Sequence, residues 1–177
     1  WIRDKGVHYL SRALRGHSGL RTLRLDHNGI SDAGARDIAR ALRDPSTVLA
    51  HLDLSGNAIS DAGTNDIAGA LQRQEQHYYA LSYLSLRLNE RITDPIGLSY
   101  ALRGRSRLAP LELGGNRITR AAAVGLLQAW ASSSGRTALL LDDNGPKRRY
   151  GWAYGGRLPV NLTRLARGGR AAPVLTG

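Results

Sequence analysis

The chain has 177 residues, of which 42% are hydrophobic and 22% charged, and these values are typical of a globular protein with one ordinary domain. It has no cysteine, which excludes a disulfide framework and a thiolate metal site, and no apolar run near the roughly 18 residues of a membrane span. The net charge of +11 is uneven: residues 145–177 hold seven basic residues and no acidic one, which leaves 18 minus 14, or +4, for residues 1–144.

The chain opens with half a copy of a pattern that then recurs. Residues 4–14 (DKGVHYLSRAL) align with residues 32–42 (DAGARDIARAL), 28 positions later. Full phrases follow as LRTLRLDHNGI (20–30), LAHLDLSGNAI (49–59), LSYLSLRLNERI (81–92) and LAPLELGGNRI (108–118), with a weaker copy, ALLLDDNG, at 138–145. Repetition with a spacing of 27 to 32 residues predicts a solenoid built from stacked coils.

Each phrase begins with a predicted strand. In the first, Leu23 and Leu25 alternate with the polar residues Thr22, Arg24 and Asp26. The same alternation is carried by Leu52/Leu54, Leu84/Leu86, Leu111/Leu113 and Leu139/Leu141. A period of two residues indicates a short strand with one buried face.

One asparagine follows each predicted strand at a fixed place: Asn28, Asn57, Asn89, Asn116 and Asn144. A buried asparagine side chain has both hydrogen-bond donors and an acceptor. We therefore expect a ladder of asparagines, one per coil, that pairs backbone groups inside the turns.

A helix is predicted after each turn. An isoleucine (Ile30, Ile59, Ile92, Ile118) precedes a residue of helix N-cap type (Ser31, Ser60, Thr93, Thr119), and Pro95 is expected in the first helical turn. The positions eight and twelve after the isoleucine are expected to be buried: Ile38, Leu42, Ile67, Leu71, Leu126 and Trp130, with Leu10 and Leu14 in the half repeat. The third repeat has one extra residue between Asn89 and Ile92, and we expect its helix to be shorter.

The phrase LxxLxLxxNxI, followed by a helix carrying DAG...IA.AL, resembles the leucine-rich repeat in its ribonuclease-inhibitor-like subtype. The resemblance covers residues 1–145 as a half repeat and about five repeats, and Pro146 replaces the next expected isoleucine. It implies an α/β solenoid that is curved, with parallel strands on the concave face and helices on the convex face.

Residues 146–177 form the second predicted region, a basic C-terminal segment that acts either as a cap or as an extension arm. Its candidate contact residues interleave basic and aromatic side chains: Lys147, Arg148, Arg149, Tyr150, Trp152, Tyr154 and Arg157. This pattern suits RNA, an acidic protein surface or an anionic membrane surface, and it also suits a solvated cap.

Catalytic signals are weak. The five histidines have no metal-ligand spacing, and neither a nucleophile elbow nor a phosphate-binding loop is present, so we expect no enzyme activity, no metal and no cofactor. His51 and Asp53 share a strand face, with His27 one repeat away, but we interpret them as ordinary polar residues on a solvated sheet.

The concave face is the candidate partner-binding surface. Its expected rows are Thr22/Arg24/Asp26, His51/Asp53/Ser55, Tyr83/Ser85/Arg87, Pro110/Glu112/Gly114 and Ala138/Leu140/Asp142. The predicted contact residues are Arg24, Asp26, His51, Asp53, Tyr83, Arg87 and Glu112, with Tyr83 and Arg87 as the preferred anchors. Alternating charge suits a protein partner better than a polyanion.

These features lead to three functional hypotheses. The first is a non-catalytic scaffold subunit of a larger intracellular assembly, in the cytoplasm, the cytoskeleton (including the axoneme) or an organelle. The second is a ribonucleoprotein subunit whose basic segment contacts RNA. The third, implied by the family resemblance, is a regulator of an enzyme such as a small GTPase, which would need a suitable loop in N-terminal repeats that are absent or truncated here.

Overall fold

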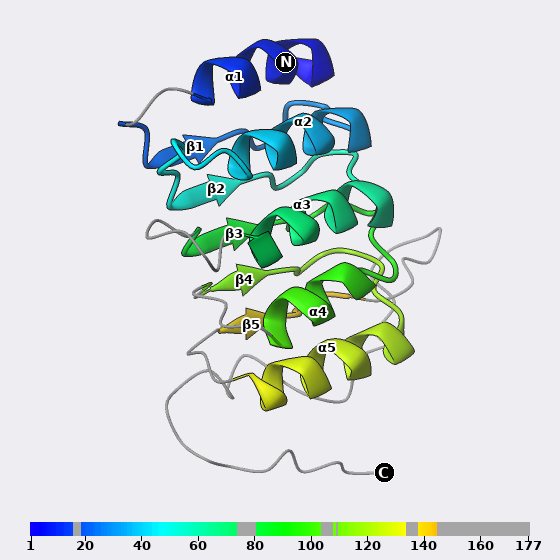
Figure 1. The fold of residues 1–177 in the computed structure, drawn as a ribbon. Coiled ribbons are helices and arrows are strands. Elements are labelled where there is room, and N and C mark those ends of the chain that lie inside the picture. Colours follow the sequence, from blue (N-terminus) through cyan, green and yellow to red (C-terminus); the bar gives the residue numbers. More distant parts are fainter. Residues whose placement is uncertain (16–18, 74–80, 104–107, 109, 134–137, 145–177) are drawn as a thin grey trace, which may run out of the picture.

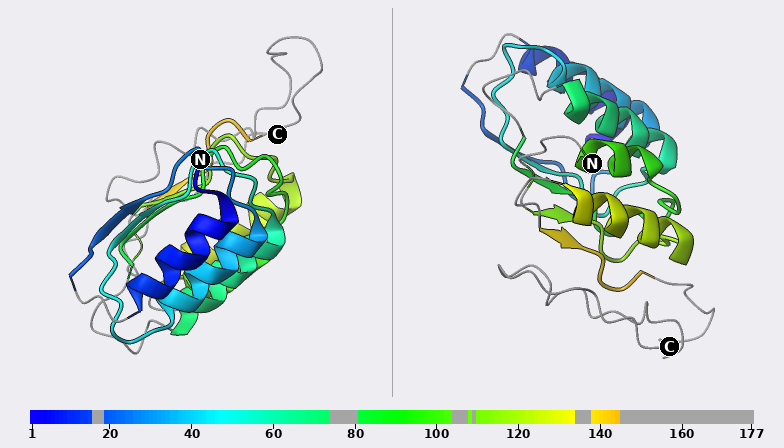
Figure 2. Two further views of the ribbon diagram at one scale, coloured as in Figure 1. Left: turned by 90° about the horizontal axis from the view of Figure 1, so that it is seen from above. Right: turned by 60° about the horizontal axis from the view of Figure 1, so that its bottom comes forward.

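A computed structural model describes residues 1–15, 19–73, 81–103, 108, 110–133 and 138–144 (Figure 1). Its elements are α1 (Arg3–Leu14), β1 (Thr22–Arg24), α2 (Asp32–Leu42), β2 (His51–Asp53), α3 (Asp61–Arg73), β3 (Tyr83–Ser85), α4 (Ile96–Arg103), β4 (Leu111–Glu112), α5 (Arg120–Ser132) and β5 (Leu139–Leu140). The strands form one parallel sheet in the order β1-β2-β3-β4-β5. Seen from the end of the stack, the helices lie on one side of the sheet (Figure 2). The prediction of an α/β repeat solenoid is confirmed.

The strand register aligns the repeats leucine by leucine. Leu23 pairs with Leu52, Leu52 with Leu84, Leu84 with Leu111 and Leu111 with Leu139. The three interior leucines of this row are fully buried, whereas Leu23 at the open edge is only partly buried. A period of two along each strand therefore places one continuous apolar layer against the helices.

Most of the predicted helix positions are buried. Ile38, Leu42, Ile67, Leu71, Leu126 and Leu14 are all at most 8% exposed. Two residues are less buried than predicted, because Leu10 and Trp130 pack against the core but are only partly covered. Leu10 belongs to the first described helix and Trp130 to the last, so each has a helical neighbour on one side only within the described residues.

The third repeat departs from the others at the start of its helix. The helix α4 has 8 residues against 13 in α3, as expected, but it begins at Ile96, so Pro95 precedes the helix instead of lying in its first turn. Thr93 was also predicted as its cap. Ser31 and Ser60 each accept a hydrogen bond from the N–H two residues later, but two residues after Thr93 stands Pro95, which has no N–H. The Thr93 hydroxyl instead donates to Asp61 at 2.7 Å.

The five asparagines each bond backbone groups of their own coil and of the preceding one. The Asn57 amide donates to the carbonyls of Leu25 and Leu54, both at 2.9 Å. Its Oδ1 accepts from the N–H groups of Asn28 and Ile30, both at 3.0 Å. Asn89, Asn116 and Asn144 bond to two successive coils in the same way, whereas the Asn28 amide reaches only its own coil and its Oδ1 accepts from Ile2. Backbone groups that the turns would leave unpaired are thereby satisfied.

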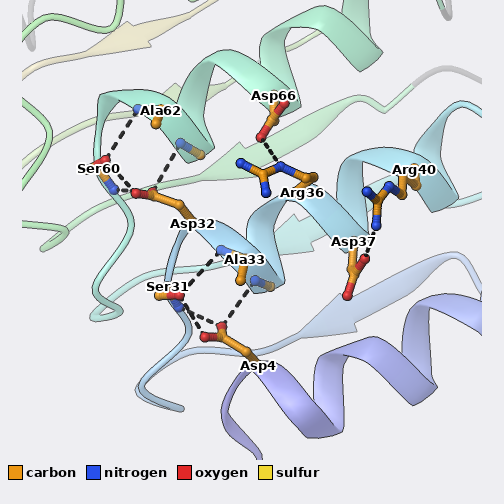
Figure 3. A network of polar contacts seen from close by, with 12 residues as sticks. Asp4, Ser31, Asp32, Ala33, Arg36, Asp37, Arg40, Ser60, Ala62 and Asp66 are labelled. Atoms are coloured by element: carbon orange, nitrogen blue, oxygen red, sulfur yellow. Dashed lines mark hydrogen bonds and ion pairs between the residues drawn. The ribbon is translucent and has the colours of Figure 1, made fainter.

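A second ladder, which the sequence analysis missed, joins the helix N-termini (Figure 3). Asp32 accepts from the Ser60 N–H and hydroxyl, both at 2.7 Å, and from the Gly63 N–H at 3.0 Å. Asp4 does the same one coil earlier, and Asp61 makes a similar set one coil later. The missed signal was an aspartate directly after each Ser or Thr in the early repeats. The ladder stops at Thr93, because in the next coil the Thr119 N–H donates to the Thr93 carbonyl at 3.0 Å and not to Asp94.

Candidate functional site: the strand face

The sheet surface that points away from the helices, here called the strand face, is the surface predicted to be concave. The register places Thr22 beside His51 and His51 beside Tyr83. A second row runs Arg24, Asp53, Ser85, Glu112 and Leu140. The sheet register thus brings Arg24, His51, Asp53, Tyr83 and Glu112 onto one surface, whereas Asp26 and Arg87 follow the strands and lie outside the paired residues.

The β1–β2 half of the strand face is open. Thr22, Arg24 and His51 are exposed. The Arg24 side chain is 73% exposed, and its Nε lies 3.7 Å from Asp26 and 3.9 Å from Asp53, too far for a hydrogen bond. The exposed Arg24 guanidinium group therefore retains hydrogen-bond donors that a partner could use.

His51 and Asp53, which the sequence analysis interpreted as ordinary polar residues, each have another neighbour on the strand face. Asp53 accepts from the Ser55 N–H at 3.0 Å and from the Ser55 hydroxyl. The His51 ring lies beside the Tyr83 ring, with 5.6 Å between centroids. The interpretation of His51 and Asp53 as polar surface residues agrees with this geometry.

The β3–β5 half is closed by its own side chains. Tyr83 donates to Glu112 Oε2 at 3.1 Å across the β3–β4 pair. Burial raises the pKa of the Tyr83 hydroxyl, and the negative charge of Glu112 raises it further, so Tyr83 stays a neutral donor. Ser85, in the row below, is buried although the sequence placed it on the solvated face, and its hydroxyl lies 3.0 Å from that of Ser55.

Arg87 and Asp142 form a clamp across three coils. The two guanidinium nitrogens donate to the two carboxylate oxygens at 3.0 and 2.9 Å, a bidentate geometry. The hydrogen bonds to Asp142 raise the pKa of Arg87 further above its ordinary value. Gly114 lies beneath the pair, where a Cβ would come within 2.7 Å of both Arg87 Nη1 and Asp142 Oδ1. Arg87 is thus a side chain already fixed in place, which its prediction as an anchor did not foresee.

The rim of the strand face carries a further row that the sequence analysis did not single out. The residue before each asparagine has a positive φ: His27, Gly56, Leu88, Gly115 and Asp143. The recurring glycine before Asn57 and Asn116 was the available signal.

Other kinds of site are not found in the part of the chain that the structure describes. Within it, no group of three or more His, Cys, Asp or Glu side chains is placed to hold a metal ion. Among the described helices, none combines the length and apolar character needed to cross a membrane. The predicted contact residues of the basic segment (Lys147, Arg148, Arg149, Tyr150, Trp152, Tyr154 and Arg157) lie outside the described residues.

Comparison with known proteins adds one finding. The family model described as Leucine Rich repeat matches residues 19–39 and 46–68. These ranges contain β1 and β2, the turns that follow them, and the first part of α2 and of α3. No curated protein gives a significant match to the chain. The match supports leucine-rich repeats in general, while the ribonuclease-inhibitor-like subtype stays a prediction.

Proposed function

We propose that this leucine-rich repeat protein is a non-catalytic interaction module that binds another protein through its strand face. Leucine-rich repeats generally mediate protein–protein interaction. That general property comes from the repeats and not from any one residue, so the proposal has to be supported by the surface itself.

The charge pattern of the strand face is the observation that carries the proposal. Asp26, Asp53, Glu112 and Asp142 contribute four carboxylates, against the two guanidinium groups of Arg24 and Arg87. A phosphate backbone would meet more negative than positive charge on this surface. A protein that presents mixed charge with an excess of basic groups is the complementary partner.

The two halves of the strand face have different roles in this proposal. The open β1–β2 half supplies Arg24 and His51, whose exposed polar atoms are available for new contacts. The closed β3–β5 half supplies side chains already held by Tyr83–Glu112 and Arg87–Asp142. Because those side chains are ordered before binding, less conformational entropy is lost when a partner docks on them.

At the level of the cell, we propose that the chain is a scaffold subunit of a larger assembly in the cytoplasm, the cytoskeleton or an organelle. The alternative is a ribonucleoprotein subunit, and it is supported by the seven basic and no acidic residues of 145–177. The two proposals differ in which part of the chain contacts the partner and in whether the partner is RNA.

Site-specific photo-crosslinking separates these proposals. A photoreactive amino acid would replace exposed Thr22 on the strand face or, as the control, exposed Gln128 on helix α5. We expect irradiation of native complexes to join a protein to position 22 and not to position 128, with the same yield after nuclease treatment. Equal crosslinking at both positions would contradict strand-face binding. Loss of the complex after nuclease would favour the RNA alternative.

A further inference from the structure

The turn residue before each asparagine lies in the left-handed region in all five described coils. In four of the five coils its N–H donates to a carbonyl of the next coil: His27 to Ser55 at 2.9 Å, Gly56 to Arg87 at 2.8 Å, Leu88 to Gly114 at 2.9 Å and Gly115 to Asp142 at 2.9 Å. The same backbone hydrogen bond thus recurs at this position with histidine, glycine and leucine alike.

Leu88 is the residue that fits this conformation least well. Its φ is 55°, in a region where glycine is favoured and where Asn, Asp and His are the better tolerated alternatives. Glycine occupies the position in two coils, and histidine and aspartate in two others. A large aliphatic side chain is thus held in a strained conformation in one coil only.

The Leu88 side chain is also exposed, although it is apolar. It is 44% accessible to solvent, so burial does not account for its presence. It rests on Gly115 of the next coil, where a Cβ would come within 2.5 Å of Leu88 Cδ2. Because Gly115 has no side chain, the Leu88 side chain can pack directly on its backbone. The residue before Leu88 in the chain is Arg87, which is held in place by Asp142.

We propose that Leu88 is the apolar anchor of the strand-face interface, a role that rests on the function proposed above. Strained residues tend to occur where function requires them, and an exposed aliphatic side chain on a fixed support is suited to contact another apolar group. The strand face that Leu88 adjoins carries four carboxylates (Asp26, Asp53, Glu112 and Asp142) against the two guanidinium groups of Arg24 and Arg87, so carboxylates are in excess after Arg87 has paired with Asp142. The fitting partner is a protein segment with an aliphatic or aromatic side chain flanked by Lys or Arg.

A purely structural role for Leu88 makes a different prediction. If Leu88 mainly covers Gly115, its replacement lowers the melting temperature. If it is an interface anchor held under strain, replacement by asparagine, which tolerates a positive φ, leaves the melting temperature unchanged or raises it while weakening binding.

The test uses the full chain and a displayed library of random dodecapeptides as the probe. Peptides enriched on the wild-type protein would be measured against Leu88→Asn, Leu88→Met, Arg24→Glu and His51→Ala. We expect enriched peptides to combine an apolar residue with basic neighbours. Leu88→Asn should weaken their affinity by about tenfold or more without loss of melting temperature, and Leu88→Met, which keeps the apolar group, should stay within about threefold.

Three results would overturn the inference. Unchanged affinity for Leu88→Asn, with losses in Arg24→Glu and His51→Ala, would remove the role of Leu88 and leave strand-face binding intact. A fall in melting temperature for Leu88→Asn would make Leu88 a packing residue. Peptides insensitive to all the substitutions, or a library that yields no binder, would overturn both this inference and the proposed function.

Discussion

At the scale of single residues, the fold depends on polar side chains buried between coils. Asn57 and Asn89 are at most 9% exposed, yet their amide groups all find backbone partners. A buried polar group is costly when unpaired and close to neutral when paired. The asparagines therefore stabilise the stack chiefly by preventing unpaired backbone groups.

Replacement of Asn57 by alanine should show this cost. The change removes partners from Leu25, Leu54, Asn28 and Ile30, and we expect a loss of about 2–4 kcal/mol in the free energy of unfolding, measured by urea denaturation. Asn28→Ala is the matched control, because Asn28 is only partly buried, and it should cost about 1 kcal/mol. Equal losses would contradict the assignment of the cost to burial.

Asp32 should make stability depend on acid pH. Burial raises the pKa of Asp32, but hydrogen bonds from the Ser60 hydroxyl and from the Ser60 and Gly63 N–H groups outweigh it, with the positive charge of Arg91 adding to them, and the net pKa is lowered. A lowered pKa in the folded state gives a stabilisation that is present above the unfolded pKa of about 3.9 and lost as the pH falls through the folded pKa.

The corresponding variant is Asp32→Asn. At pH 7 the free energy of unfolding of this variant should be about 1–2 kcal/mol lower than that of the wild type. The difference should shrink as the pH falls below about 4. Asp66→Asn removes a half-buried carboxylate whose ion pair with the exposed Arg36 lies at the surface, and it should cost less than about 0.5 kcal/mol. A difference between wild type and Asp32→Asn that does not vary with pH would refute the role of the Asp32 charge.

At the scale of the elements, β3, β4 and β5 are linked by side chains as well as by the sheet. The Arg87–Asp142 pair joins residues 55 positions apart and passes over Gly114 of the middle coil. The small residue and the ion pair are therefore interdependent, because any Cβ at position 114 occupies the space of the clamp.

Double-mutant analysis of Gly114→Ala and Arg87→Ala should reveal this dependence. Gly114→Ala alone should cost about 1–3 kcal/mol through collision with the clamp, and in the Arg87→Ala background it should cost at least about 1 kcal/mol less. Thermal or urea unfolding of the four proteins gives the coupling energy. Strictly additive effects would mean that the methyl group and the clamp do not compete for space.

At the scale of the whole molecule, the solenoid is held together by contacts between adjacent coils. Each helix packs on the next helix and each strand on the next strand, as Figure 1 shows. In such a fold, stability is approximately a sum of repeat and neighbour contributions. A residue in an interior coil should therefore matter more than its equivalent at an edge of the stack.

The leucine row of the sheet tests this gradient. Leu84 on β3 is fully buried, whereas Leu23 on β1 occupies the same strand position but is only partly buried. We expect Leu84→Ala to cost about 3 kcal/mol and Leu23→Ala about 1 kcal/mol in urea unfolding. Similar costs at both positions would show that the β1 edge is as well covered in solution as the interior.

The sequence by itself determined the repeat, the order of strands and helices and the inward-facing rows, because these depend on spacings within about 30 residues of chain. It also identified the asparagine positions, since one residue type recurs at one place. It failed locally at Thr93, where Pro95 takes the place of the residue whose N–H caps Ser31 and Ser60.

Only the tertiary structure decided how the strand face is organised. The pairing of Tyr83 with Glu112, the clamp between Arg87 and Asp142 and the positive φ of Leu88 all arise from the stacking of one coil on the next. Strand periodicity tells which residues share a surface, but not which of them pair. Pairing depends on side-chain reach across coils and on the space left by residues such as Gly114 and Gly115, and these are properties of the assembled stack.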